Sequence, residues 1–156
     1  MTANWHAEND GATEKEVQVF LYGLVRLLQP EYVVEIGTYQ GHGASAIGNA
    51  LKDNEHGQLD TLDISETEHQ RALLRCGGLP VNLLTLDARR FAPKQKIDLL
   101  FLDGGEDRFG DYLYFWPHLN RPAWIVIHDA KRYHPALFMG GLRIDISRGL
   151  ALWEIH

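Results

Sequence analysis

The feature that most constrains the fold of this chain is a regular alternation of short apolar segments with segments of helical periodicity. Five apolar segments of strand length lie at 32–36, 59–63, 81–86, 97–102 and 123–128. Segments of helical character lie before or between them, at 13–29, 44–52, 66–76 and 111–116. This alternation predicts a doubly wound α/β fold, with a mainly parallel sheet and helices on both faces.

Both ends of the chain add to this pattern. Thr13 and Glu16 have the spacing of a helix capping box, which predicts that the first helix begins at residue 13. Residues 1–12 show no apolar periodicity, so we expect a flexible arm followed by a single domain over 13–156. At the other end, the segments 142–147 and 150–155 flank Arg148-Gly149 and predict a closing antiparallel hairpin.

The composition of the chain disfavours several classes of binding partner. Asp and Glu number 21 against 15 Lys and Arg, a net charge of −6 that disfavours nucleic acid and anionic lipid as partners. Cys76 is the only cysteine, which excludes an internal disulfide or a CxxC site. The chain has neither an apolar run of ~20 residues nor a signal-like start. We therefore expect a cytoplasmic protein that does not bind membranes.

Glycine or aspartate follows each of the five apolar segments. These residues are Gly37, Asp63, Asp87, Asp103 and Asp129. In parallel α/β sheets, ligands bind beyond the carboxyl ends of the strands. The pattern therefore predicts a ligand-binding cleft at that edge of the sheet.

The first of these turns, residues 35–43, has the spacing G-x-x-x-G-x-G. This spacing differs from the G-x-G-x-x-G of dinucleotide sites, and the turn lacks a basic residue. Glu35 would also repel a phosphate. The turn thus favours a cationic nucleoside without phosphates over a nicotinamide dinucleotide, although a glycine-rich turn can also be a tight connection only.

Two later strand ends have the chemistry to hold a nucleoside. Asp63 lies 26 positions after Gly37, where an acid of a dinucleotide fold binds ribose hydroxyls; the alternative is a helix cap. Asp87-Ala88 can place a carboxylate and a backbone N–H beside a base edge. Asp87 could equally cap the short turn at Arg89-Arg90.

Four segments carry a resemblance to a known family. In chain order they are EIGTYQGHG, LDIS, LDA and FLDGGEDRF. This ordered set resembles the class I S-adenosylmethionine-dependent methyltransferases, in particular the small-molecule O-methyltransferases, and is distantly similar to the catechol O-methyltransferases. The resemblance spans about residues 13–135. It implies a Rossmann-like sheet of strand order 3-2-1-4-5-7-6 and methyl transfer to a small-molecule, hydroxyl-bearing acceptor.

The same resemblance implies a set of residues that bind S-adenosylmethionine. Asp63 would bind the ribose, and Ile64 would contact the adenine. Asp87 and Ala88 would flank the adenine, and Asp103 would lie near the methionine end. The methionine part would be lined by Glu35, Gly37, Thr38, Tyr39 and Gly41.

Asp103 and Asp129 also form a candidate metal site. Both end neighbouring strands, so their carboxylates could share Mg²⁺, which prefers oxygen ligands. In metal-dependent O-methyltransferases such a cation binds the acceptor oxygen and lowers its pKa. However, Ala130 cannot supply a third ligand and His128 is a poor one for magnesium, so the sequence does not decide whether a metal is used.

Glu106, His128 and Asp129 are the candidate catalytic residues. Glu106 lies where the resemblance implies a histidine or lysine, and it could act as a base, join the metal site or be an exposed acid at a helix start. His128 has an ordinary pKa near neutrality, which suits a general base. Consecutive strand residues point to opposite faces, which argues against His128 and Asp129 sharing one cleft.

Two classes of function remain, an enzyme and a binding module. The chain has few residues before its first strand and after its fifth from which to build a lid over an acceptor. It could therefore bind S-adenosylmethionine or its demethylated product without catalysis. Alternatively, a neighbouring subunit of a homo-oligomer could complete the acceptor pocket.

Overall fold

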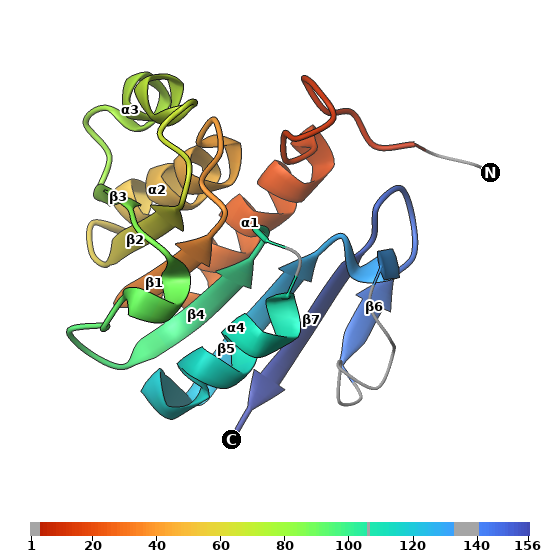
Figure 1. Cartoon of the computed structure of the whole chain (residues 1–156). Helices are drawn as coiled ribbons and strands as arrows, with labels where there is room; N and C mark the ends of the chain where they lie inside the picture. The colour runs from red at the N-terminus through yellow and green to blue at the C-terminus, as the bar shows by residue number, and fades with distance from the viewer. Residues whose placement is uncertain (1–3, 106, 133–140) are drawn as a thin grey trace.

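A seven-stranded sheet forms the centre of the protein in the computed structural model, which describes residues 4–105, 107–132 and 141–156 (Figure 1). Its strands follow the order β3-β2-β1-β4-β5-β7-β6. They are β1 (Tyr32–Ile36), β2 (Gln58–Asp63), β3 (Val81–Thr85), β4 (Ile97–Leu102), β5 (Leu119–His128), β6 (Leu142–Ile144) and β7 (Leu150–Ile155). The predicted fold class and strand order are confirmed.

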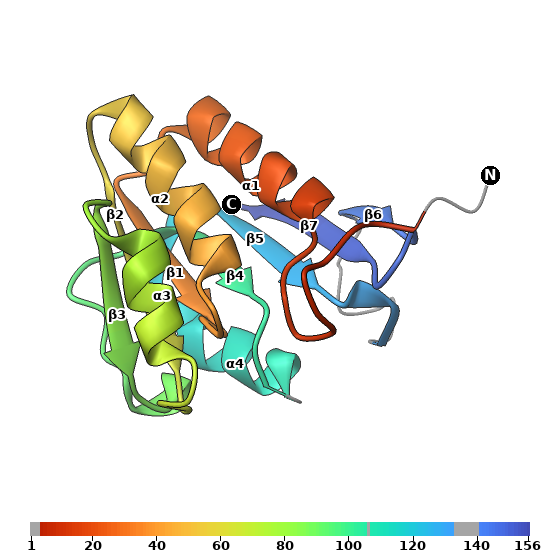
Figure 2. The same cartoon turned by 90° about the horizontal axis from the view of Figure 1, so that it is seen from above.

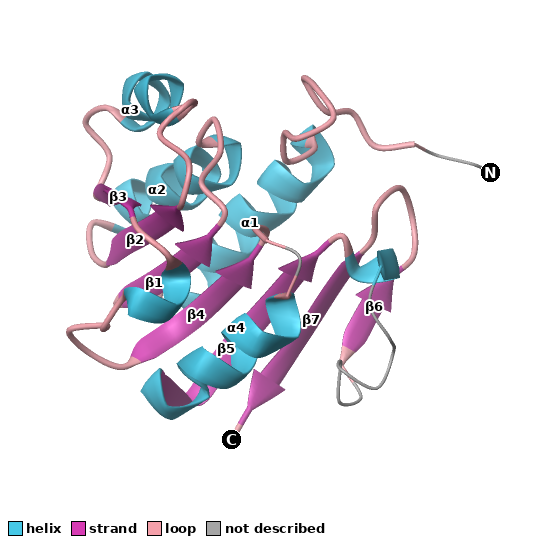
Figure 3. Ribbon diagram, viewed as in Figure 1, coloured by secondary structure: helices cyan, strands magenta, loops and turns pink. Residues whose placement is uncertain are grey.

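The first five strands are parallel, and β7 pairs antiparallel with β5 and with β6. The carboxyl ends of β1 to β5 therefore meet at one edge of the sheet, as the arrowheads in Figure 3 show. In the register of β1 and β4, Ile36 pairs with Leu102, so the residues that follow both strands emerge side by side. This edge is where the sequence predicted a ligand cleft.

Helices cover both faces of the sheet (Figure 2). Three of them, α1 (Lys15–Leu28), α2 (His42–Asn54) and α3 (His69–Cys76), lie on one face, and α4 (Arg108–Phe115) lies on the other. Short 3₁₀ turns follow three of the strands or helices, at Ala88–Arg90, Trp116–His118 and Ala130–Arg132. In the described parts of the chain, no helix is long and apolar enough to cross a membrane.

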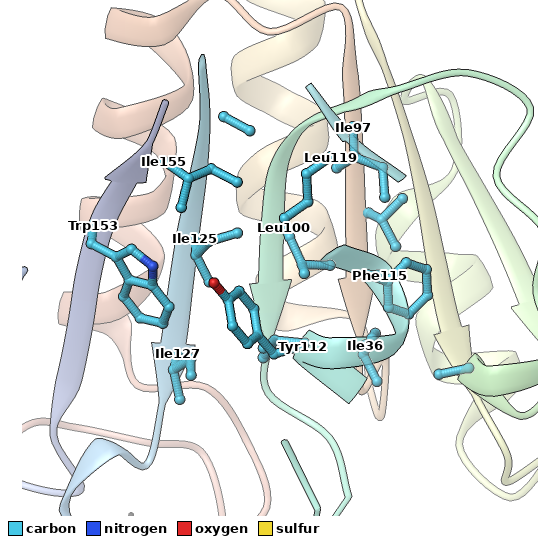
Figure 4. Close-up of a cluster of buried hydrophobic side chains, with 14 of the residues drawn as sticks. Ile36, Ile97, Leu100, Tyr112, Phe115, Leu119, Ile125, Ile127, Trp153 and Ile155 are labelled. Carbon is cyan, nitrogen blue, oxygen red and sulfur yellow. The ribbon is translucent and has the colours of Figure 1, made fainter. Parts of the chain in front are cut away.

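Alternate residues of β4 build the two halves of the core. Leu99 and Phe101 pack with α1 and α2, whereas Leu100 and Leu102 pack towards α4. On the α4 side, the rings of Tyr112 and Trp153 meet edge to face at 5.8 Å between centroids (Figure 4). Because side chains of a strand alternate between faces, the apolar residues 99–102 of this strand can be buried on both sides.

The start of α1 differs from the sequence prediction. The predicted capping box is wrong: Glu14 is the N-cap residue, and no side chain caps the helix. The hydroxyl of Thr13 instead donates to Asp103 Oδ2 at 2.9 Å. Glu16 accepts from the backbone N–H of His6 at 2.8 Å. Tertiary contacts, which the local spacing cannot reveal, have recruited both side chains of the expected box.

The described residues of the arm, 4–12, pack against the carboxyl edge of the sheet (Figure 2). Ala12 is buried, and Arg148 donates to the carbonyl oxygens of Asp10 at 3.1 Å and Ala12 at 2.6 Å. The arm therefore makes specific contacts with the hairpin at the far end of the chain. The division of the chain at residue 13 stays a prediction.

Two matched leucine substitutions test this arrangement of the core. Leu100→Ala should lower the free energy of unfolding by about 2–5 kcal/mol, because it leaves a cavity at a fully buried site. Leu74→Ala removes the same atoms from a side chain that is 85% exposed, and should change stability by less than about 0.5 kcal/mol. Urea unfolding of both variants measures the difference, and equal losses would contradict the assigned core.

Candidate active site

Two adjoining cavities lie at the carboxyl edge of the sheet. The larger, of about 340 Å³, is lined by Ile36, Gly37, Leu62, Asp63, Ile64, Leu86, Asp87, Ala88, Arg89, Gly104, Gly105, Asp107 and Asp111. The smaller, of about 140 Å³, is lined by Gly11, Thr13, Gly37, Thr38, Tyr39, Gln40, His42, Asp63, Asp103 and Gly104. Most of the residues predicted to bind a cofactor therefore line one cleft with two parts.

Gly37 and Gly104 bring the turns after β1 and β4 into close contact. Gly37 has φ of +99°, and a Cβ on it would meet the backbone nitrogen of Gly104 at 2.4 Å. A Cβ on Gly104 would likewise meet the backbone of Gly37 at 2.6 Å. Any side chain here would push the two turns apart. The two glycines thus shape the wall that both cavities share.

Asp63 is fixed at the end of β2 by two backbone contacts. Its Oδ2 accepts from the N–H of Tyr39 at 2.8 Å, and its Oδ1 accepts from the N–H of Ser65 at 2.9 Å. Asp63 does not cap α3, whose N-cap residue is Glu68. Each carboxylate oxygen keeps a lone pair for a further donor, and Asp63 lines both cavities. This placement suits a group that accepts from ribose hydroxyls.

Residues after β3 form the far wall of the larger cavity. Asp87 accepts from the N–H of Arg89 at 2.8 Å, so it caps the following turn, as the alternative interpretation of the sequence expected. Ala88 is buried against the cavity, whereas Ile64 on the opposite side is 78% exposed. An aromatic base could lie between these apolar side chains.

Arg89 lines the larger cavity, a role that the sequence analysis did not assign to it. Its guanidinium donates to Asp107 Oδ2 at 2.6 Å and to Asp111 Oδ1 at 3.0 Å. No local pattern joins these three residues, because Arg89 and Asp107 are 18 positions apart. The pairing leaves the mouth of the cavity acidic overall.

Glu35 lies beneath the first turn and lines neither cavity. Burial raises the pKa of its carboxyl group well above the usual range, and the nearby carboxylates of Asp103 and Asp63 raise it further. Thr61 donates a hydrogen bond to it at 2.5 Å. The raised pKa disfavours the charged form of Glu35, which weakens the argument that its charge would repel a phosphate.

Other residues of the turn support it from different positions. Tyr39 has φ of +45° and lines the smaller cavity, while its hydroxyl donates to Asn9 of the arm at 3.2 Å. Thr38 is buried and shares a hydrogen bond with Thr61. Gly41 is the N-cap residue of α2 and lies against Ala72, outside both cavities. Gly41 thus positions the turn without lining the cleft.

A buried group of six charged side chains, the charge cluster, adjoins the smaller cavity. Its members are Glu14, Asp103, Arg108, His128, Asp129 and Arg148. Asp129 has φ of +57°, which breaks the alternation of the strand. His128 and Asp129 therefore join the same cluster, but neither of them lines one of the two cavities, so the expectation that they do not share one cleft is not contradicted.

His128 is held between two carboxylates. Its Nδ1 lies 2.6 Å from Asp103 Oδ1 and its Nε2 lies 2.6 Å from Glu14 Oε2, and its side chain is fully buried. Burial by itself lowers the pKa of His128, but these two contacts outweigh burial and raise it to about 9. His128 is thus a buried imidazolium at neutral pH, which does not suit the predicted role of general base.

For Glu14, too, burial and the charged neighbours shift the pKa in opposite directions. Burial by itself raises its pKa, but the ion pair with His128 and the hydrogen bonds from Arg148 outweigh burial and lower the pKa well below the usual range. Arg108 donates to Asp129 Oδ2 at 3.0 Å and lies 3.6 Å from Asp103 Oδ1. Three carboxylates therefore face three cations, and the cluster is neutral as a whole.

The predicted metal ligands do not fit a magnesium ion in this arrangement. Potential ligand atoms of Asp103, His128 and Asp129 lie within 4.8 Å of one another. However, both ring nitrogens of His128 face carboxylates, and Arg108 lies at both aspartates. A divalent cation prefers oxygen ligands that are free of such competing cations. The charge cluster already supplies the positive charge that a metal would bring.

Sequence reasoning missed several members of the site. Thr13, Glu14, Arg108 and Arg148 gave no local signal of a shared site, and Glu14 and Arg148 are 134 positions apart. The predicted nearness of Asp103 and Asp129 was the one clue. Glu106 lies outside the described residues.

The charge cluster predicts a specific pH dependence of stability. Because the pKa of His128 is raised from 6.5 to about 9 on folding, its stabilising effect is complete below pH 6.5 and is lost as pH rises towards 9. The loss amounts to up to about 3 kcal/mol. Urea unfolding between pH 6 and 9.5 measures it. His128→Gln should flatten the decline, whereas His56→Gln should keep it; equal slopes in all three proteins would contradict the assignment.

Comparison with known proteins identifies the family. A methyltransferase from Geobacter sulfurreducens superposes with a TM-score of 0.78 at 18% identity, over 92% of this chain and 80% of that one. An O-methyltransferase from Bacillus cereus gives 0.76 at 16% identity, over 95% and 84% of the two chains. No curated protein matches. A family model described as a methyltransferase domain matches residues 34–130. The chain therefore belongs to this methyltransferase domain family.

Proposed function

We propose that the protein transfers a methyl group from S-adenosylmethionine to a hydroxyl oxygen of a small molecule. The observation that carries this proposal is the two-part cleft at the carboxyl ends of β1 to β4, with Gly37, Asp63 and Gly104 shared by both parts. Structural neighbours add support: the Bacillus cereus O-methyltransferase was solved with S-adenosylhomocysteine, and the O-methyltransferase TomG from Streptomyces achromogenes with S-adenosylmethionine.

The residues of the cleft fit a nucleoside with an amino-acid tail. The larger cavity pairs apolar surfaces from Ile64 and Ala88, which suit a base, with the carboxylate of Asp63, which suits ribose hydroxyls. The smaller cavity continues from it past the Gly37–Gly104 contact towards Asp103. Acidic side chains dominate the walls, and this favours a cationic ligand over a phosphate.

The chain's own residues would act mainly by positioning. The bound cofactor supplies a methyl group already activated on a sulfonium, so alignment of the acceptor is the main requirement. Asp103 is held by Thr13, His128 and Arg108, and it presents a fixed carboxylate at the end of the smaller cavity. That carboxylate would orient an acceptor hydroxyl. No step of this proposal uses a metal.

A second candidate function is a binding module that holds the cofactor without catalysis. The observation in its favour is that His128, the expected base, is a buried imidazolium, and that Asp103 already forms an ion pair with it. The raised pKa of His128 leaves this imidazole protonated at neutral pH, so it is unsuited to act as a base. The two functions share the cofactor site and differ only in turnover.

Binding of S-adenosylhomocysteine tests the shared part. Asp63→Asn should weaken binding by about 10- to 100-fold, because it removes the charge that accepts from the ribose hydroxyls. Asp53→Asn is a matched control, because Asp53 lies at the carboxyl end of α2, opposite to the end that adjoins the cleft. It should leave the affinity unchanged. Titration calorimetry measures both. Unchanged affinity in a folded Asp63→Asn protein would overturn the cofactor assignment. Gly37 is unsuited to such a test, because a side chain there displaces the backbone of Gly104.

Formation of S-adenosylhomocysteine from S-adenosylmethionine distinguishes the methyltransferase from the binding module. Catechol and simple phenols serve as acceptors, with and without EDTA. We expect product release that depends on the acceptor and is unaffected by EDTA, since the charge cluster needs no metal. Tight cofactor binding with no acceptor-dependent release would favour the binding module, and activity abolished by EDTA would contradict the metal-free proposal.

A further inference from the structure

His42, the first residue of α2, lines the smaller cavity and carries a buried polar atom without a hydrogen-bond partner among the described residues. His42 is only 6% exposed, and its Nε2 makes no hydrogen bond to any described residue. Burial lowers the pKa of His42, and the charge of Arg75 lowers it further. A buried donor without an acceptor is costly, so this atom is suited to a ligand.

The surroundings of His42 favour a negatively charged ligand. Helix α2 has 13 residues, no side chain caps its start, and its first turn contains no acid. Arg75 is held beside this helix start by a hydrogen bond from its Nε to the carbonyl oxygen of Gln40 at 3.0 Å. A helix start, a buried imidazole and a fixed guanidinium together make a site for an anion.

A carboxylate of the arm already lies at this position. Glu8 Oε2 is 3.3 Å from His42 Nε2 and 3.5 Å from Arg75 Nη2. The contact with His42 lacks the geometry of a hydrogen bond, and the Glu8 side chain is 60% exposed. Ion pairs with so exposed a partner contribute little to stability. Glu8 thus marks a carboxylate position but occupies it weakly.

We propose that His42 and Arg75 bind the α-carboxylate at the amino-acid end of the cofactor, and that Glu8 takes its place in the free protein. This inference rests on the proposed function, since it assigns the tail of the same cofactor. The smaller cavity leads from Asp63 and Gly37 to His42, so a nucleoside bound in the larger cavity would extend its tail towards this site. Gly11 of the arm and Thr13, which follows the arm, also line this cavity. The carboxylate of Glu8 must therefore move away when the cofactor binds.

Two nucleosides separate this proposal from the proposed function. S-adenosylhomocysteine carries the amino-acid tail, whereas 5′-methylthioadenosine lacks it. Arg75→Gln should weaken binding of S-adenosylhomocysteine by about 10-fold and leave 5′-methylthioadenosine within about 2-fold. His42→Gln should have the same selective effect. Glu8→Gln should tighten S-adenosylhomocysteine by about 3- to 5-fold, because a competing carboxylate is removed.

Arg71→Gln is the matched control, because Arg71 lies on the same helix, is 65% exposed and pairs only with Glu68 among the described contacts. It should change neither affinity. Thermal melts verify that each variant is folded, and Arg75→Gln carries the test if His42→Gln does not fold, since Arg75 is one-third exposed.

The outcomes are distinguishable. Equal losses for both nucleosides, or none for either in Arg75→Gln, would overturn the carboxylate site while the proposed function survives. Unchanged binding in Glu8→Gln would overturn the role of the arm. A wild-type protein that binds neither nucleoside would overturn the proposed function and this inference with it.

Discussion

The charge cluster is the interaction on which the functional edge of the sheet depends. It joins the start of α1 through Glu14, β4 through Asp103, β5 through His128 and the hairpin through Arg148, so segments from both ends of the chain meet at one point. Removing one partner of a buried ion pair leaves an uncompensated charge, which costs about 3–5 kcal/mol. The cluster therefore ties the position of the arm to that of the strand ends.

This neutral arrangement also decides which chemistry is available. A pair of strand-end aspartates that could share a metal instead faces Arg108, Arg148 and an imidazolium. Side chains of the protein thus supply the positive charge, and they orient the carboxylates without a metal ion. In such a site, the burden of methyl transfer falls on alignment of the acceptor with the cofactor.

The arm gives the cleft its second wall. Gly11 lines the smaller cavity and Glu8 lies at the start of α2, while Thr13, which directly follows the arm, donates to Asp103. A segment without apolar periodicity therefore contributes two different contacts to the site. Its polar composition suits contacts with charged groups at the sheet edge, and it also allows those contacts to be exchanged for contacts with a ligand.

The sequence by itself determined the sheet and the edge that carries the site, because strand and helix periodicities and strand-end residues are local properties. The order of the strands was implied by the family resemblance. The sequence also determined that Gly37, Asp63, Asp87 and Asp103 share that edge. Only the tertiary structure decided the pKa shifts of Glu35 and His128, since pKa values depend on burial and on partners distant in sequence. The same holds for the pairing of Glu14 with Arg148, because no local pattern spans the whole chain.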